Sequence, residues 1–369
     1  NKLTGLNFII TPYWLNFLQE YDMNHIELVK RSIEFNNPDY LPMELVDVPG
    51  IYNAYGTLDP ETVTFIPGSE NFDSGWATYH WTFSQVGKTS AGENLRKDEW
   101  GVIQKIPLDE NSAYIIERSP LAEGKGIENY EFPSPEITEP FFEKISKIVR
   151  ARYADRFICG YIDPGAFLIA YNIFGYQTFF IKLSEDIKLV VEVIDRIFQF
   201  HHALIPKWKK AGAHMVNVID EIAGNNGLFF SPEIWQKYFK RFYEKLFKRI
   251  HQQDMYTGLL FDGDISAIFD DVLKMEIDVL QFVQPNVVGI KTLKEKVKGK
   301  KCLKCSVDMM STLACGTPED VEREAKILVE NFNSRNGGFI CNVLRWHRPR
   351  YPENNVIASV ETFNRYRKK

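Results

Sequence analysis

The sequence predicts a single α/β domain folded as a (β/α)8 barrel, the TIM-barrel class. Its 369 residues are enough for two average domains, but α/β barrels commonly fold a chain of this length as one. From residue 157 onward, short apolar segments alternate with longer amphipathic ones, which indicates repeated strand–helix units and a parallel sheet. Six strands are predicted, at residues 157–161, 215–219, 256–261, 278–282, 302–306 and 339–343.

Amphipathic segments between these strands predict helices. Two of them have clear start signals, because Ser231 and Thr317 each stand directly before a Pro-Glu pair. This arrangement places an N-cap residue before proline at the first helical position, with an acid in the first turn. The predicted helices cover residues 185–208, 232–252, 265–274 and 318–333.

The N-terminal part of the chain has a different character. Apart from a helical pattern over residues 25–35, residues 1–150 consist of short segments broken by glycine and proline. We expect residues 1–150 to be an extension that decorates the barrel mouth within one domain, and residues 151–369 to supply most of the barrel strands. A separate hydrophobic core in the first 150 residues would contradict this expectation.

Composition excludes several classes of function. The formal net charge is −5, and lysine and arginine are spread along the chain, so nucleic acid and membrane surfaces are not expected partners. No apolar run reaches the about 18 residues that a membrane span needs. The five cysteines are an odd number in a large chain, which is typical of a reduced, cytoplasmic protein. The lone Cys302-x-x-Cys305 motif is interpreted as part of a buried strand.

Polar side chains follow four of the predicted strands. In (β/α)8 barrels the active site lies where the carboxyl ends of the strands meet, so these side chains are the candidates for chemistry. One of the adjacent pair Asp220 and Glu221 is expected to point into the mouth. The strand-end candidates are Asp220, Glu221, Asp262, Asp264, Asp308, Arg345 and His347.

Two of these groups have structural alternatives. Asp262 and Asp264 flank Gly263, and such a pair also forms a turn stabilised by its own side chains. Arg345 and His347 lie in a basic, aromatic segment that is either a surface turn or an anion clamp, since arginine binds carboxylates with two parallel hydrogen bonds.

Several phrases of the sequence together resemble the uroporphyrinogen decarboxylase superfamily over roughly residues 24–366. Each phrase alone is weak, but they occur in the expected order and at the expected spacing, and the resemblance implies the same (β/α)8 barrel. The phrases lie at residues 28–44, 98–101, 211–233, 261–265, 307–322 and 352–366.

The chain departs from the decarboxylase branch of this superfamily. Residues 7–23 contain no arginine. Members of the decarboxylase branch, by contrast, resemble one another in an N-terminal arginine-rich loop that holds the acidic side chains of the tetrapyrrole. Tyr171 is the counterpart of the branch's tyrosine, but Glu221 stands in place of its serine and Arg345 in place of its histidine. Carboxylates in the mouth would also repel a polyanionic substrate, so tetrapyrrole decarboxylation is not expected.

The chain also departs from the zinc-dependent methyltransferase branch. The His-x-Cys-Gly signature of that branch corresponds here to residues 260–263, which read Leu-Phe-Asp-Gly, and its last cysteine corresponds to Arg345. Leucine has no lone pair and arginine is a permanent cation. We therefore expect no metal at the position given by Leu260, Asp262 and Arg345.

The chain resembles the remaining large group of the superfamily, which are methyltransferases. This resemblance implies transfer of a methyl group from a small donor, such as a methoxylated compound with a carboxylate. The acceptor that it implies is a corrinoid (cobalamin) carried by a partner protein. The predicted catalytic residues are Glu221, Asp262 and Tyr171. The predicted substrate-binding residues are Arg345, His347, Asp308 and Asp220. Two alternatives stay open: a decarboxylase or lyase of a small acid that uses Asp262 and Tyr171, and a non-catalytic barrel that binds a corrinoid or another partner.

Overall fold

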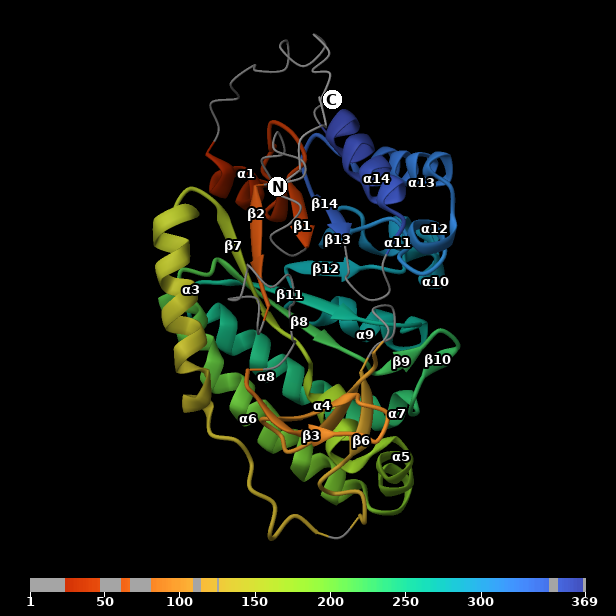
Figure 1. Cartoon of the computed structure of the whole chain (residues 1–369). Coiled ribbons are helices and arrows are strands. Elements are labelled where there is room, and N and C mark those ends of the chain that lie inside the picture. Colours follow the sequence, from red (N-terminus) through yellow and green to blue (C-terminus); the bar gives the residue numbers. More distant parts are fainter. Residues whose placement is uncertain are drawn as a thin grey trace, which may run out of the picture.

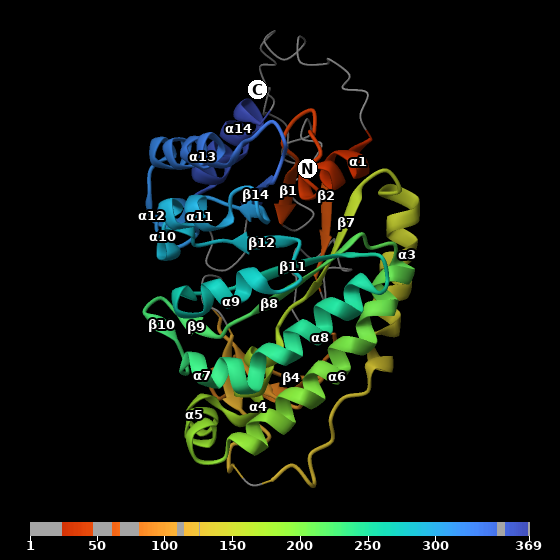
Figure 2. The ribbon, with the colours of Figure 1, turned by 180° about the vertical axis from the view of Figure 1, so that it is seen from behind.

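The computed structural model describes residues 24–46, 61–66, 81–108, 114–124, 126–344 and 351–367. Within them, eight parallel strands close into a barrel in the order β1-β14-β13-β12-β11-β8-β7-β2, surrounded by helices (Figures 1 and 2). The predicted fold class is confirmed. The barrel strands are β1 (Met43–Val46), β2 (Thr62–Phe65), β7 (Phe157–Ile162), β8 (Met215–Asp220), β11 (Tyr256–Phe261), β12 (Val279–Phe282), β13 (Cys302–Cys305) and β14 (Phe339–Leu344).

The helices occupy the intervals between the barrel strands. The segment that was expected to form one helix at residues 232–252 is divided by a π-helical turn at Trp235–Phe239. The longer helices are α1 (His25–Ile33), α3 (Glu139–Arg152), α4 (Ala166–Phe174), α5 (Tyr176–Glu185), α6 (Ile187–Ala211), α8 (Lys240–His251), α11 (Ile290–Val297), α13 (Pro318–Phe332) and α14 (Glu353–Tyr366). The shorter ones are α7 (Pro232–Ile234), α9 (Phe269–Lys274), α10 (Pro285–Val288) and α12 (Thr312–Cys315).

The six predicted strands are confirmed, with ends that differ by no more than one residue. Both predicted helix starts are also present. Ser231 Oγ accepts a hydrogen bond from Ile234 N, and Thr317 forms a capping box with Asp320. Cys302 and Cys305 are buried on β13, as their structural interpretation predicts. In the described ranges, no helix has the length and apolarity that crossing a bilayer demands.

The N-terminal part supplies more than an extension at the mouth. β1 pairs with β14 and β2 pairs with β7, so this part of the chain completes the barrel. It also forms an antiparallel four-stranded sheet outside the barrel, which lies beside α4 in both views (Figures 1 and 2). The sheet consists of β3 (Phe83–Lys88), β4 (Asn94–Asp98), β5 (Ile103–Ile106) and β6 (Ile115–Arg118).

The barrel interior holds an ion pair. Lys304 Nζ of β13 lies 2.7 Å from Glu44 Oε2 of β1, and both side chains are 0% exposed. Lys304 Nζ also donates to the Tyr161 hydroxyl at 3.2 Å, and the Thr64 hydroxyl donates to Glu44. Burying two charges requires good geometry and further hydrogen bonds to offset their lost hydration, and these neighbours provide them.

Amide side chains extend this network across the barrel. Asn217 Nδ2 of β8 donates to Gln281 Oε1 of β12 at 2.7 Å. Gln281 Nε2 lies 3.5 Å from Asn342 Oδ1 of β14, and Asn342 Nδ2 lies 3.4 Å from Glu44 Oε2. Seven barrel strands (β1, β2, β7, β8, β12, β13 and β14) are thus tied together by polar side chains, where such barrels usually place branched apolar side chains.

Candidate active site at the barrel mouth

The centre of the candidate site is a hydrogen bond between Tyr171 and Glu221. Glu221 follows the last residue of β8, and Tyr171 lies on α4. The Tyr171 hydroxyl donates to Glu221 Oε2 at 2.6 Å, and both side chains are half-buried. Glu221 forms no ion pair with any residue in the described ranges. The structure therefore brings together two of the three predicted catalytic residues.

The surroundings of Glu221 favour its protonated form. Burial is the largest cause that raises the pKa of its carboxyl group, and the charges of Asp262 and Asp220 raise it further. The Tyr171 hydrogen bond lowers this pKa, but the net direction is upward. Burial and the Glu221 charge also raise the pKa of the Tyr171 hydroxyl, so this hydroxyl stays a hydrogen-bond donor. A carboxylic acid with a raised pKa is suited to donate a proton.

Asp262 follows β11 and shares the mouth with Glu221. Gln284 Nε2 donates to Asp262 Oδ1 at 2.7 Å, and Gly263 N donates to the same oxygen at 3.0 Å. Burial raises the pKa of Asp262, and the charge of Asp308 adds to this rise. Asp264 has a different place, because its Oδ1 accepts from Ser266 N at 2.8 Å. The turn interpretation thus describes Asp264, while Asp262 is electrostatically coupled to Glu221.

Gly263 makes the turn between these two aspartates possible. Its φ is +84°, and a Cβ atom there would lie 2.6 Å from the carbonyl oxygen of Ala223. We expect Gly263→Ala to lower the free energy of unfolding by about 1–3 kcal/mol or more, since backbone strain and a collision with backbone act together. Urea titration measures the loss. Gly299→Ala is the matched control, because Gly299 also has a positive φ but no atom within 4 Å of its Cβ position. Equal losses in the two variants would contradict the collision.

Asp220 lies below the mouth and holds α4 in place. It is 0% exposed, and its carboxylate accepts from Phe167 N at 2.9 Å and from Leu168 N at 3.0 Å. The Tyr243 hydroxyl donates to it at 2.7 Å. Both oxygens are already occupied, so the structure places Asp220 as a positioning residue at the start of α4 rather than as a group that faces a substrate. Through α4, Asp220 also positions Tyr171.

Asp308 organises the loop that follows β13. Its Oδ1 accepts from Met310 N at 3.1 Å, from Ser311 N at 2.9 Å and from the Ser311 hydroxyl at 2.8 Å. Its Oδ2 lies 3.3 Å from Asn286 N. The side chain is buried, and its negative charge acts on Asp262. Its role in the described structure is therefore that of a turn residue that contributes charge to the mouth.

Two tyrosines belong to the site although no sequence pattern indicated them. The Tyr351 hydroxyl is buried and has no hydrogen-bond partner among the described residues, and the charges of Asp262 and Asp308 add to the effect of burial in raising its pKa. Burial raises the pKa of Tyr114 to about 12, with contributions from Glu221 and from Asp163, the residue after β7. Tyr114 directly precedes β6, so the four-stranded sheet reaches the mouth.

Arg345 and His347 lie outside the described residues. In the described ranges, no group of three or more histidine, cysteine, aspartate or glutamate side chains is arranged to hold a metal ion. Leu260 stands where the zinc-dependent methyltransferase branch has a zinc ligand, and its side chain is buried in the hydrophobic core.

Comparison with known proteins identifies the family. The sequence profile described as uroporphyrinogen decarboxylase (URO-D) matches residues 104–366, which is more than half of the chain. The chain belongs to the uroporphyrinogen decarboxylase family. A comparison with curated protein sequences gives no significant match.

One solved structure shares the fold of this URO-D family member, and two others are less similar to it. A methyltransferase from Methanosarcina mazei superimposes with a TM-score of 0.68 at 15% identity, covering 93% of this chain and 99% of that one. A B12-independent methionine synthase from Shewanella sp. W3-18-1 gives 0.41 at 12% identity over 69% of each chain. Xylanase B from Clostridium stercorarium F9 gives 0.42 at 10% identity, covering 86% of this chain and 88% of that one.

The part of the chain that matches the URO-D family contains the residues of the candidate site. Tyr171, Glu221, Asp262, Asp308 and Tyr351 all lie between residues 104 and 366. Strands β1 and β2 precede the matched segment, but they close the same barrel. The family assignment and the site therefore concern the same carboxyl-terminal face of the barrel.

Proposed function

We propose that this URO-D family member is a cytoplasmic methyltransferase that moves a methyl group from a small donor to the Co(I) of a corrinoid carried by a partner protein. The observation that carries the proposal is the Tyr171–Glu221 pair, in which a half-buried acid has a raised pKa and no ion pair in the described ranges. The fold similarity to the Methanosarcina mazei methyltransferase is consistent with it.

Glu221 acts as the general acid in this proposal. The methyl group leaves the donor oxygen without the electrons of the C–O bond and is accepted by Co(I), which supplies the electron pair. The donor oxygen keeps the electrons of the broken bond and takes the proton from Glu221. Such proton donation accelerates a reaction by about 10²–10⁴-fold. Burial, with the charge of Asp262 added to it, keeps the pKa of Glu221 raised, and Tyr171 holds the Glu221 carboxyl group in one orientation.

The remaining site residues have supporting roles. Arg345 binds a carboxylate of the donor through two parallel hydrogen bonds, as arginine is suited to do, and His347 is a further substrate-binding residue. The Tyr351 hydroxyl, which has no hydrogen-bond partner within the described ranges, is available to a polar group of the donor. Asp220 positions α4, which carries Tyr171, and Asp308 organises the loop that follows β13. The site uses no zinc in this proposal, because Leu260, Asp262 and Arg345 stand at the positions where the zinc-dependent methyltransferase branch has its ligands.

A second candidate function is decarboxylation of a small organic acid. Tyr171 is the counterpart of a decarboxylase tyrosine, and it lies in hydrogen-bond contact with a carboxyl group in the mouth.

One experiment separates the two functions. The full chain is incubated with a Co(I) corrinoid protein and a panel of methoxylated compounds, and in parallel with small carboxylic acids alone. Loss of Co(I) absorption with an equal amount of demethylated product supports methyl transfer. Release of CO₂ from an acid without the corrinoid protein supports decarboxylation and contradicts methyl transfer.

A further inference from the structure

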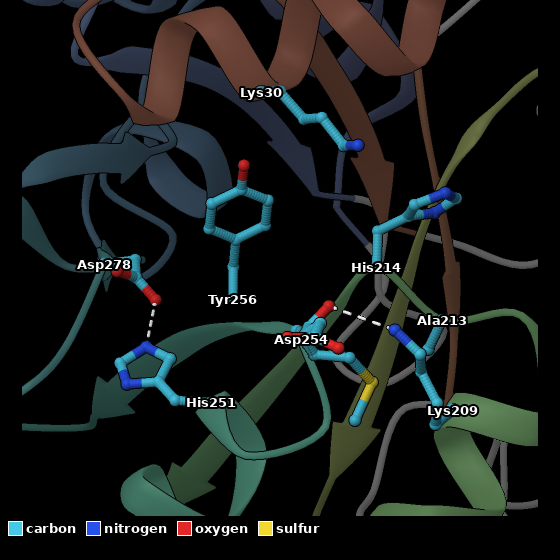
Figure 3. Close-up of a pocket in the computed structure, with 9 residues that line it drawn as sticks. Lys30, Lys209, Ala213, His214, His251, Asp254, Tyr256 and Asp278 are labelled. Carbon is cyan, nitrogen blue, oxygen red and sulfur yellow. Dashed lines mark hydrogen bonds and ion pairs between the residues drawn. The ribbon is translucent and has the colours of Figure 1, made fainter.

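A pocket of about 540 Å³ lies at the opposite end of the barrel from Glu221 and Asp262. Figure 3 shows the residues that line it. Its lining comes from the beginnings of strands. His214 directly precedes β8, Tyr256 is the first residue of β11, and Asp278 directly precedes β12. Glu221 and Asp262 follow the ends of β8 and β11, so the length of the barrel separates this pocket from the candidate active site.

Two lysines reach the pocket from different helices. Lys30 comes from α1, and Lys209 comes from the last turn of α6. Lys30 Nζ forms no hydrogen bond or ion pair with any residue of the described ranges, while Lys209 Nζ donates to the carbonyl oxygen of Asp254 at 3.2 Å. Figure 3 shows Lys30 reaching in from α1, with His214 and Lys209 on the side opposite Asp278 and His251. Two ammonium groups are thus available to a ligand in the pocket.

His214 adds a third donor with a fixed orientation. Its Nδ1 accepts a hydrogen bond from Ile158 N at 2.9 Å, so the ring is neutral and its proton is on Nε2. Burial, together with the charges of Lys30 and Lys209, lowers the pKa of His214 to about 4. The ring stacks on Phe157 with a centroid distance of 5.1 Å. In the described ranges, Nε2 has no hydrogen-bond partner, so its N–H is free for a ligand.

The acidic groups of the lining are largely engaged elsewhere. Asp278 Oδ2 lies 2.7 Å from His251 Nε2 and accepts from Thr257 N at 2.7 Å. The Tyr256 hydroxyl donates to Glu34, which leaves the Tyr256 ring as an apolar wall. The carboxylate of Asp254 is the remaining acid, and this residue is exposed to solvent. The pocket therefore offers cations and an N–H donor on one side and an aromatic surface beside them.

We propose that this pocket binds the phosphate group of a small organic molecule through Lys30, Lys209 and the Nε2–H of His214. A phosphate monoester carries a charge of about −1.5 to −2 near pH 7, which two lysines match, and lysine is a common phosphate ligand. The pocket is larger than a phosphate ion needs, so the organic part of the ligand lies against the Tyr256 ring. The site is independent of methyl transfer, and its test requires neither a methyl donor nor a corrinoid.

The test uses the full chain and inorganic phosphate. The imidazole signals of His214 are followed by NMR while phosphate is added, with acetate as the comparison anion of lower charge. We expect a saturable shift of the His214 signals, with phosphate binding more tightly than acetate. Lys30→Gln and Lys209→Gln should each raise the Kd for phosphate about tenfold or more, because each removes one charge-assisted hydrogen bond.

Lys188→Gln is the matched control, since Lys188 is an exposed residue in the first turn of α6, the helix that carries Lys209 at its other end. Its Kd for phosphate should equal that of the wild type. The proposal is overturned if phosphate causes no saturable shift of His214, if acetate binds as tightly as phosphate, or if Lys30→Gln and Lys209→Gln bind phosphate like the control. Circular dichroism of each variant verifies that it is folded.

Discussion

Glu221→Gln is expected to transfer methyl groups at least about 10²-fold more slowly than the wild type, with little change in donor affinity. Glutamine keeps the shape of the side chain and still accepts the Tyr171 hydrogen bond, which measures 2.6 Å in the wild type. It has no proton of suitable acidity to give to the departing oxygen. The measurement is the single-turnover rate of Co(I) consumption at saturating donor, together with the donor concentration that gives half the maximal rate.

Asp264→Asn is the matched control for Glu221→Gln. Asp264 lies on the same face of the barrel, but its carboxylate accepts a turn hydrogen bond from Ser266 N, which asparagine also accepts. Its rate should stay close to that of the wild type. If Glu221→Gln keeps full activity while Asp262→Asn abolishes it, Asp262 and not Glu221 is the acid. If both variants behave like the wild type, the carboxylates of the mouth are structural.

Lys304→Met is expected to lower the free energy of unfolding by about 3–5 kcal/mol. The reason is that Glu44, which is 0% exposed, would lose its cation and remain buried. Glu44→Gln combined with Lys304→Met should recover much of this loss, because neither side chain is then charged. Urea titration of the three proteins measures both effects.

The exposed ion pair Lys296–Asp270 is the control, because it has nearly the same N–O distance as Lys304–Glu44 but is not buried. Its Nζ–Oδ1 separation is 2.6 Å, but its side chains are 38% and 71% exposed. Lys296→Met should therefore leave the free energy of unfolding close to that of the wild type. A Lys304→Met variant as stable as Lys296→Met, or a double variant no more stable than Lys304→Met alone, would contradict the account of the buried network.

The strands that the sequence predicted are those with continuous apolar runs. β7 and β8 are buried along nearly their whole length, and such strands are apparent from hydrophobicity alone. β1 and β2 are four residues long, and Glu44 of β1 points into the barrel interior. A charged residue in a short segment indicates a surface loop unless its partner is known. That partner, Lys304, lies far along the chain, and only the closed barrel brings the two together.

The candidate site, too, has residues that the sequence predicts and residues that only the folded structure reveals. The rule that chemistry lies at strand ends selected Glu221 and Asp262 from the sequence, and the resemblance selected Tyr171. The rule does not distinguish Asp220 from Glu221, because it gives the end of β8 and not the direction of each side chain. Tyr114 and Tyr351 were missed, since their place in the site depends on how the outer sheet and the segment before α14 pack onto the barrel.

Whether Glu221 is a proton donor can be measured directly by a carboxyl ¹³C NMR titration of the full chain, with its signal assigned by comparison with Glu221→Gln. The expected result is a pKa clearly above the ordinary glutamate value of about 4.3, because burial and the charges of Asp262 and Asp220 raise it. In Asp262→Asn this pKa should fall, since one of the like charges is removed. A pKa at or below about 4.3 that does not respond to Asp262→Asn would contradict the role of Glu221 as the acid of the barrel mouth.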